Sequence, residues 1–470
     1  MTTTDVESNR CASGPAIVLI ANRGEIARRL IRGVQGQGLR ALAVYAADDA
    51  DLPYVSEADL ATELHSEGGV PYMDVEQLVA VALKAGAVAV HPGYGFLSER
   101  PAFAKAIVDA GLRWIGPSPE AIEAMGDKVR SKQTMVAHGV PVLPGSSDPV
   151  TSVEVAVEVA AEVGYPVMLK SSAGGGGMGM IIARSEAEVR KEFEQAQSRA
   201  ERLFGDATML LERYVERARH IEIQVFGLTD GTVIALGERD CSVQRRHQKV
   251  VEEAPSPFVD GQLRRKLSAA AVRAATAISY LGAGTVEFVV DADTGEFFFL
   301  EMNTRLQVEH PVTEAVTGVD LVAEQVRLAL GRPSGLGRGE VELAGAAVEL
   351  RVYAEDPVRF LPSPGDITLW DEPDVEGVRV DSGYRAGNTV SRRYDPLLAK
   401  VIAHAPSRAA ALERARAAID GFRIEGIKTN LSFLRLLLDD PEFASGNYDT
   451  SVISRMAPRE AAPNRQGVNA

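Results

Sequence analysis

The strongest constraint in this chain is a predicted β-hairpin that ends in a cluster of polar side chains. Residues 285–290 and 296–300 have strand composition, and the DADTG run between them supplies turn residues. The segment 301–314, EMNTRLQVEHPVTE, follows at once and combines carboxylates, an amide, an arginine, a glutamine and a histidine. So many polar groups directly after an apolar strand indicate either a site or a solvated edge.

The register of this hairpin predicts which of its side chains face each other. If the turn centres on Thr294, Glu287 lies opposite Glu301, and Asn303 shares their side of the sheet. Facing carboxylates repel each other unless a cation lies between them, and carboxylates beside an amide oxygen suit Mg²⁺ with nucleotide phosphates. A solvated acidic face is the alternative.

Composition excludes several classes of protein. The 470 residues are 46% hydrophobic and carry 65 acidic against 50 basic side chains, a net charge of -15 that argues against binding to nucleic acid or to anionic membranes. No apolar run approaches the ~20 residues of a membrane span. Residues 1–15 lack the apolar centre of a signal peptide, which predicts a cytoplasmic protein with a disordered N-terminus. Cys11 and Cys241 support neither a disulfide framework nor a zinc site.

The N-terminal region has the pattern of a doubly wound α/β unit. Residues 16–21 and 39–45 are predicted strands, with a helix at 26–34 between them. No G-x-G-x-x-G fingerprint follows the first strand, so a dinucleotide site is not expected. A later strand at 87–90 leads into the loop HPGYGFLSE at 91–99, which is either shaped to approach a ligand or is a plain structural turn.

A glycine-rich loop lies between two further predicted strands. The strand at 165–170 ends on Lys170, and five glycines occupy six positions of the loop before a strand at 180–183. Backbone N–H groups of such a loop can surround phosphate oxygens, while a flexible linker is the alternative. It is not a Walker loop, because no Gly-Lys-Ser/Thr follows. A helix at 152–163, capped by Gly164, precedes this unit, and a capping box at 185–188 opens the helix that follows it.

Two neighbouring stretches predict an anion site. The run 220–226 alternates, so that three aliphatic residues face the core and His220, Glu222 and Gln224 share the other face, which is either a site or solvated. The following stretch 237–249 concentrates cationic side chains in an acidic protein. It therefore indicates an anionic ligand, or alternatively a salt-bridged loop.

Together these motifs resemble the biotin carboxylase family of ATP-grasp ligases, from about residue 16 to 455. The motifs are ANRGEIA at 21–27, HPGYGFLSE at 91–99, MGDK at 125–128, the glycine loop around Gly174, ERDCSVQRRHQK at 238–249, the segment 301–314, AEDP at 354–357 with FLPSPG at 360–365, and GIKTN at 426–430. The resemblance implies an α/β and α+β fold, with a Rossmann-like N-terminal domain at 16–127. A linker and ATP-grasp lid at 128–214 and a C-terminal ATP-grasp and biotin carboxylase domain at 215–456 follow. Residues 457–470 are expected to be a disordered tail.

The resemblance also implies the reaction and its residues. The activity would be ATP-dependent carboxylation of biotin by bicarbonate through carboxyphosphate, with two Mg²⁺ ions, or Mn²⁺ in their place. The nucleotide would be bound by Lys128, Lys170, Gly176, Gly177, Glu212, Arg213, Tyr214, Val215, His220, Gln244, His247, Glu287 and Glu301, and the metals by Glu287, Glu301 and Asn303. Bicarbonate would be held by Lys249, Arg305, Gln307 and Val308, Glu309 would deprotonate it, and Arg351 would stabilise the biotin enolate.

The chemistry requires these residue types in its own right. Bicarbonate is a poor nucleophile, so a carboxylate must remove its proton while cations hold it beside the γ-phosphate. Carboxyphosphate is unstable, so the glycine-rich lid is expected to close and exclude water. Two positions depart from the family pattern: Met178 replaces a basic residue in the loop, which weakens the expected phosphate contacts, and Arg213 replaces a lysine where the backbone is expected to bind.

The partners follow from what the sequence lacks. Biotin is carried on a lysine flanked by methionines, and no Met-Lys-Met run occurs in the chain. We therefore expect a separate biotin carrier protein, a separate carboxyltransferase subunit and, from the resemblance, a homodimer. The final carboxyl acceptor, whether acetyl-CoA, propionyl-CoA, pyruvate or urea, is not set by this sequence. The alternatives are another ATP-grasp carboxylate ligase or a catalytically silent nucleotide-binding subunit.

Overall fold

A computed structural model describes residues 14–456, apart from residues 67, 147, 172–179, 338 and 340. The predictions for Gly176, Gly177 and Met178, and those for the tails at 1–13 and 457–470, lie outside the described residues. Within the described range, no helix is long and apolar enough to cross a membrane.

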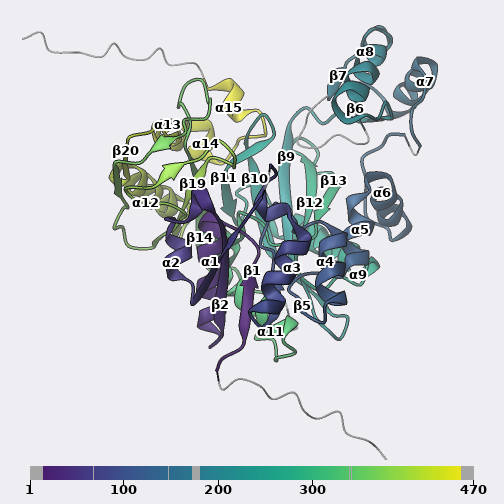
Figure 1. The fold of residues 1–470 in the computed structure, drawn as a ribbon. Helices are drawn as coiled ribbons and strands as arrows, with labels where there is room; N and C mark the ends of the chain where they lie inside the picture. Colours follow the sequence, from purple (N-terminus) through teal and green to yellow (C-terminus); the bar gives the residue numbers. More distant parts are fainter. Residues whose placement is uncertain are drawn as a thin grey trace, which may run out of the picture.

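The N-terminal region is a five-stranded parallel sheet of order β3-β2-β1-β4-β5, as the doubly wound pattern predicts (Figure 1). Its strands are β1 (Ile17–Ile20), β2 (Arg40–Ala46), β3 (Leu60–Leu64), β4 (Ala87–His91) and β5 (Arg113–Trp114). The helices around it are α1 (Gly24–Gly36), α2 (Pro53–Glu57), α3 (Val75–Lys84), α4 (Pro101–Asp109) and α5 (Pro119–Gly126), with short 3-10 turns η1 (Ala47–Asp49) and η2 (Pro71–Met73). One face of the apolar strands and of α3, α4 and α5 buries a common core, whereas the apolar face of α1 belongs to a second core.

A small unit carries the two strands that flank the glycine-rich loop. It contains α7 (Val153–Val163), β6 (Val167–Ser171), β7 (Ile181–Ala183), α8 (Glu186–Phe204) and β8 (Met209–Arg213). The preceding helix, α6 (Lys128–Ala137), packs instead on the body of the molecule, where Met135 is buried. The sheet of the small unit is antiparallel with the order β7-β6-β8, and α7 and α8 pack on it over an apolar cluster of their own. In Figure 1 the part with α7, α8, β6 and β7 projects from the body of the molecule.

The caps predicted for these helices are mostly confirmed. Gly164 caps α7 with φ of 85°, a conformation that glycine adopts without strain. Ser185 caps α8 by accepting a hydrogen bond from the Glu188 N–H. The reciprocal half of the capping box is wrong, because the Glu188 carboxylate accepts from the Arg184 N–H rather than from Ser185.

The largest element is an eight-stranded antiparallel sheet of order β13-β12-β9-β10-β11-β14-β19-β17. Its strands are β9 (Ala218–Gly227), β10 (Val233–Arg245), β11 (Gln248–Ala254), β12 (Gly282–Asp291), β13 (Phe297–Asn303), β14 (Ala346–Tyr353), β17 (Val378–Ser382) and β19 (Leu397–Ala405). The other elements are α9 (Gly261–Ala277), α10 (His310–Thr317), α11 (Leu321–Ala329), α12 (Arg408–Gly421), α13 (Leu431–Leu438), α14 (Pro441–Ser445), α15 (Val452–Arg455) and the short strands β15 (Gly365–Asp366), β16 (Leu369–Asp371), β18 (Thr389–Val390) and β20 (Arg423–Glu425).

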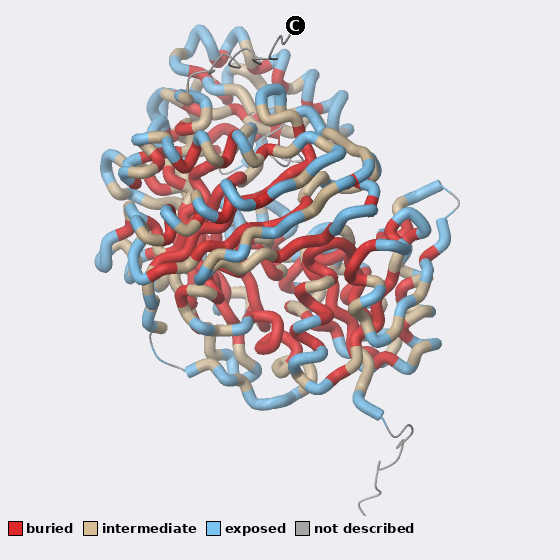
Figure 2. Tube along the Cα trace, turned by 90° about the vertical axis from the view of Figure 1, so that its left-hand side faces the viewer, coloured by how far each residue is buried: buried red, intermediate tan, exposed pale blue. Residues whose placement is uncertain are grey.

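One apolar core joins this sheet to the N-terminal region. The cluster contains Val18 and Leu30 of the N-terminal region together with Leu350 and Val401 of the large sheet. Figure 2 shows the buried trace concentrated in the strands and the exposed trace at the periphery. The alternative of a salt-bridged loop for residues 237–249 is wrong, because most of this stretch lies in two paired strands of the sheet, β10 and β11.

The last residue of β4 gives a prediction about acid stability. His91 is fully buried, and burial lowers its pKa from an ordinary value near 6.5 to about 3. Between these values the unfolded chain binds a proton that the folded protein excludes, so this contribution to stability is complete above pH 6.5 and is lost as the pH falls toward 3. Chemical denaturation from pH 7 to 5 should show the free energy of unfolding falling, by up to about 1.4 kcal/mol per pH unit from this group.

His91→Gln removes the titrating group and should flatten that slope. His138→Gln, at an exposed position, serves as the control and should keep it. An unchanged slope in His91→Gln would rule out His91 as the source.

Candidate active site

Four charged residues form one line across the large sheet. The strand registers pair Arg239 on β10 with Glu222 on β9, Glu222 with Glu287 on β12, and Glu287 with Glu301 on β13. Paired residues of an antiparallel sheet point to the same face. The predicted hairpin register is therefore confirmed, and two further strands extend the line of charges that it begins.

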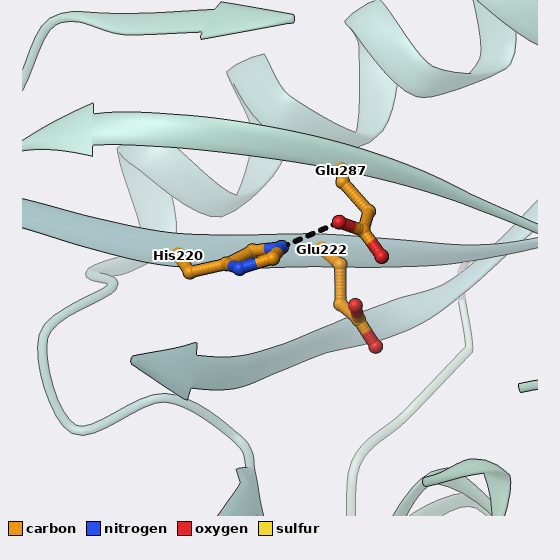
Figure 3. A group of neighbouring side chains, drawn as sticks. All are labelled: His220, Glu222 and Glu287. Atoms are coloured by element: carbon orange, nitrogen blue, oxygen red, sulfur yellow. Dashed lines mark ion pairs between the residues drawn. The ribbon is translucent and has the colours of Figure 1, made fainter. Parts of the chain in front are cut away.

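The predicted solvated alternatives are wrong for most of this face. Glu222 and Gln224 are fully buried and Glu287 is only 4% exposed. Glu301, at the open end of the line, stays accessible. Figure 3 shows His220 pointing along the sheet toward Glu287, where its Nε2 lies 2.7 Å from a carboxylate oxygen.

Lys249 lies at the centre of the acidic side chains. It comes from β11, and its Nζ lies 2.6 Å from Glu222, 3.0 Å from Glu287 and 2.6 Å from Glu309. Burial opposes its charge, but these carboxylates outweigh burial and hold the pKa of Lys249 well above its usual range. The ammonium is thus a fixed positive charge, with its hydrogens directed at three acceptors.

Glu309 lies between two cations just before α10 begins. One oxygen accepts from Lys249 at 2.6 Å and the other from Arg351 Nη2 at 3.0 Å. Burial alone raises the pKa of Glu309, but Lys249, Arg351 and Arg239 together hold it far below its usual value. The group is therefore an ionised, fully buried carboxylate, which is the protonation state that a general base requires.

Arg351 also contacts a second carboxylate, that of Glu252. Its Nη2 also forms an ion pair with Glu252 on the neighbouring strand β11. Glu252 faces Glu349 across the β11–β14 pair, and burial together with neighbouring charge raises the pKa of Glu252 to about 7 despite the arginine. This arrangement fixes the guanidinium in place and leaves it between two carboxylates of different basicity.

The loop at 91–99 reaches the segment that follows β13. Glu99 accepts from Arg305 Nε at 2.8 Å and from the Thr304 N–H at 3.2 Å. Arg305 also donates to the Asn303 side-chain oxygen at 2.9 Å. The loop is therefore packed against the polar segment, and its approach to a ligand stays a prediction.

The remaining bicarbonate candidates lie beside these groups. Gln307 donates to Glu287 Oε1 at 3.0 Å. The carbonyl of Val308 accepts from Lys400 Nζ at 2.8 Å, and Lys400 is fully buried and also lies 3.2 Å from Glu25 of α1. No local pattern predicted a role for Lys400, because the strand that carries it is about ninety residues from Val308 in the chain.

Most nucleotide candidates lie on the small unit or at its border with the sheet. Lys170 pairs with Glu212 at 2.5 Å, and Glu212 is also within 3.4 Å of Lys132. Burial and the nearby Lys170 lower the pKa of Lys128. The Gln244 amide lies 2.6 Å from His220 Nδ1.

Four further nucleotide candidates lie near the end of β8 or at a turn. The side chain of Arg213 extends toward Asp291 and Glu296 at 3.8 and 3.6 Å, and its backbone N–H bonds to Pro144. Tyr214 bonds through its N–H to Pro166, and Val215 is buried after it. His247 lies at the β10–β11 turn with φ of 67°, away from the line of charges.

The donor set of the hairpin fits a hard divalent cation. Glu287 and Glu301 face each other directly, and Asn303 donates to Glu287 through its amide nitrogen at 2.9 Å. Desolvation by the surrounding protein atoms and the facing Glu287 both raise the pKa of Glu301, and a cation between the two carboxylates would reverse this shift. His220, Glu222 and Glu287 also bring ligand atoms within 4.8 Å of one another. Carboxylate and amide oxygens of this kind are what Mg²⁺ prefers.

Three domain models match the chain in succession. The biotin carboxylase N-terminal domain matches residues 15–122, the ATP-binding domain of the carbamoyl-phosphate synthase L chain matches 127–335, and the biotin carboxylase C-terminal domain matches 349–455. With the small unit and the charged sheet described above, these matches define the protein as an ATP-grasp ligase.

Individual relatives match over nearly the whole chain. Biotin carboxylase of Halalkalibacterium halodurans is 49% identical, over 93% of this chain and 97% of that protein. The propionyl-CoA carboxylase alpha chain of Ruegeria pomeroyi is 46% identical, over 94% of this chain and 68% of that one. The biotin carboxylase–β,γ-ATP complex of Campylobacter jejuni superimposes with a TM-score of 0.89 at 42% identity, covering 93% of this chain and 98% of that one. The chain belongs to the biotin carboxylase family.

Proposed function

We propose that this enzyme carboxylates biotin on a separate carrier protein, using ATP and bicarbonate and forming carboxyphosphate as the intermediate. The observation that carries the proposal is the position of Lys249 and Arg351 on either side of Glu309, with Arg305 beside them. An ionised carboxylate held by two cations suits the deprotonation of a bound anion. A complex of the Hydrogenobacter thermophilus biotin carboxylase domain, 42% identical over 94% of this chain with a TM-score of 0.89, contains MgADP and bicarbonate.

In the first step, bicarbonate binds to the Lys249 ammonium in place of some of its contacts with carboxylates. Lys249, Arg305, the Gln307 amide and the backbone at Val308 hold the anion, and Glu309 takes its proton. The bicarbonate oxygen then attacks the γ-phosphorus in line, the bond to ADP breaks, and carboxyphosphate and ADP result. Because bicarbonate draws the cations away from Glu309, its pKa rises toward a value at which it accepts the proton.

The nucleotide would lie between the small unit and the sheet. Its phosphates would meet Lys128, Lys170, His220, Gln244 and His247 and the loop glycines Gly176 and Gly177, and its base would meet the segment from Glu212 through Arg213 and Tyr214 to Val215. Glu287, Glu301 and Asn303 would hold Mg²⁺, two ions or Mn²⁺ in their place, which neutralises the phosphate charge when bound. The lid carrying the glycine loop would close over the site and exclude water.

In the second step, carboxyphosphate breaks down to CO₂ and phosphate. The phosphate takes the proton of the ureido nitrogen of biotin, and the nitrogen attacks CO₂. Arg351 stabilises the enolate oxygen, since its guanidinium stays charged and is already fixed by Glu252.

The organisation of the protein is part of the proposal. The domains would be 16–127, 128–214 and 215–456, and β8 ends at Arg213, next to the second of these boundaries. A carboxyltransferase subunit would receive the carboxybiotin, the enzyme would be cytoplasmic, and it would form a homodimer. The Hydrogenobacter domain is described as a dimer.

ADP release provides the test of this function. It should require bicarbonate and should be strongly stimulated by biotin, more by a biotinylated carrier domain than by free biotin, because the carrier adds remote binding energy. ADP release at a rate that depends on neither bicarbonate nor biotin would refute the proposal.

The metal assignment gives a separate prediction. Glu287→Gln and Glu301→Gln should each raise the Mg²⁺ concentration for half-maximal ADP release, on the order of tenfold or more, while thermal melting without metal changes little. Glu296→Gln, on the same hairpin but exposed, is the control and should titrate as the wild type does. Wild-type activity of both variants at every Mg²⁺ concentration would remove these residues from the metal site.

A further inference from the structure

Arg239 is a fully buried arginine to which the proposed mechanism gives no role. Its guanidinium donates to Glu222 Oε1 at 2.5 Å, to Gln224 Oε1 at 2.7 Å, to Thr313 Oγ1 at 2.9 Å and to Thr285 Oγ1 at 3.0 Å. These partners come from β9, β12 and α10. A planar guanidinium with partners on three elements is fixed in one orientation.

The first consequence concerns Glu222. Its two carboxylate oxygens are divided, since Oε1 is held by Arg239 and Oε2 accepts from Lys249 Nζ at 2.6 Å. A carboxylate with one oxygen fixed by an arginine cannot turn its other oxygen away from the lysine. Arg239 thereby fixes one side of the Lys249 ammonium.

The second consequence concerns Glu309. Thr313 lies in the first turn of α10, four residues after Glu309, and residues at this spacing lie one above the other on a helix. Glu309 holds Lys249 from the other side at 2.6 Å. The same guanidinium therefore holds the Glu222 carboxylate directly and holds the first turn of the helix that Glu309 precedes.

We propose that Arg239 is a positioning residue, which sets the place of Lys249 between Glu222 and Glu309 and thereby the affinity of the enzyme for bicarbonate. The inference rests on the proposed function, in which Lys249 binds bicarbonate. It predicts an effect on one substrate that a merely structural arginine would not have.

Arg239→Lys tests this, because lysine keeps the positive charge but lacks the planar guanidinium with its several N–H donors. Its KM for bicarbonate should rise and its bicarbonate-dependent ADP release should fall, each by about 10–100-fold, while the KM for ATP stays within about twofold. Arg219→Lys is the matched control. Arg219 is also a buried arginine, on β9, but its partners are Asp240 and the carbonyl of Gly446. The Arg219→Lys variant should therefore be less stable than the wild type but have an unchanged KM for bicarbonate.

A milder pair of variants tests the same contact without altering any charge. Thr313→Val removes the hydroxyl that Arg239 binds and should raise the KM for bicarbonate several-fold, whereas Thr313→Ser keeps the hydroxyl and should restore it. These variants decide the question if Arg239→Lys does not fold.

The outcomes separate the inference from the proposed function. If wild-type ADP release does not depend on bicarbonate, the proposed function fails and the inference fails with it. If the wild type depends on bicarbonate but Arg239→Lys and Thr313→Val keep its KM, the inference alone is overturned. It is also overturned if Arg219→Lys changes the bicarbonate KM as much as Arg239→Lys does.

Discussion

Glu309→Gln should reduce bicarbonate-dependent ADP release by about 10²–10⁴-fold, the usual contribution of a general base. The amide keeps the size of the side chain but cannot take a proton, and it removes one of the acceptors of Lys249 and Arg351. Steady-state ADP release at saturating ATP and bicarbonate measures the effect. Binding of ATP should change little, because Glu309 has no expected contact with the nucleotide.

Glu314→Gln is the matched control for this variant. Glu314 is a second buried glutamate on α10, paired with Arg29 at 2.7 Å and with Arg379 at 2.9 Å, and none of these residues has a role in the proposed chemistry. Its loss should lower stability and leave turnover by the folded enzyme near that of the wild type. Activity of Glu309→Gln within a fewfold of that control would mean that another group removes the proton.

Arg351→Ala should separate the two halves of the reaction. Carboxyl transfer to biotin should fall by about 2.7–4 kcal/mol in transition-state stabilisation, as for a lost oxyanion donor, while slow bicarbonate-dependent ADP release continues. Lys249→Ala should impair both activities, because it removes the cation that holds bicarbonate. The two activities are read as labelled carboxybiotin formed and ADP released in the same reaction.

Arg408→Ala controls for the loss of a buried arginine–glutamate pair. Arg408 forms an ion pair with Glu253 at 2.6 Å. Glu253 is the neighbour in sequence of Glu252, which pairs with Arg351, but Arg408 itself lies outside the proposed site. It should leave the ratio of the two activities unchanged. If Arg351→Ala and Lys249→Ala instead lost both activities in the same proportion, the division into an enolate site and a bicarbonate site would be wrong.

The hairpin shows how far sequence alone can place a site. Alternation along a strand and one turn of defined length are local, so Glu287 and Glu301 were placed opposite each other correctly. The doubly wound opening and the caps at Gly164 and Ser185 were also predicted from local patterns. The roles of the individual site residues stay predictions until variants are measured.

The sequence could not predict which side chains from distant strands contact one another. Glu222 was recognised as polar on an apolar strand, but its burial follows only from the pairing of β9 with β10 and β12. The contact of Arg351 with Glu252 joins strands about a hundred residues apart, and periodicity within either strand carries no information on their register. Arg239 was visible as one cation of a cluster, whereas its four partners come from three separate elements.

The central claim is that bicarbonate attacks the γ-phosphate of ATP in this site, and the fate of the bicarbonate oxygens tests it most directly. With [¹⁸O]bicarbonate, ATP and biotin in a single turnover, the mass of the released phosphate reports whether an oxygen has moved. The account predicts one ¹⁸O in each phosphate, because the attacking oxygen stays on phosphorus when carboxyphosphate releases CO₂. Phosphate without ¹⁸O would show that water supplies the attacking oxygen, and would contradict the mechanism.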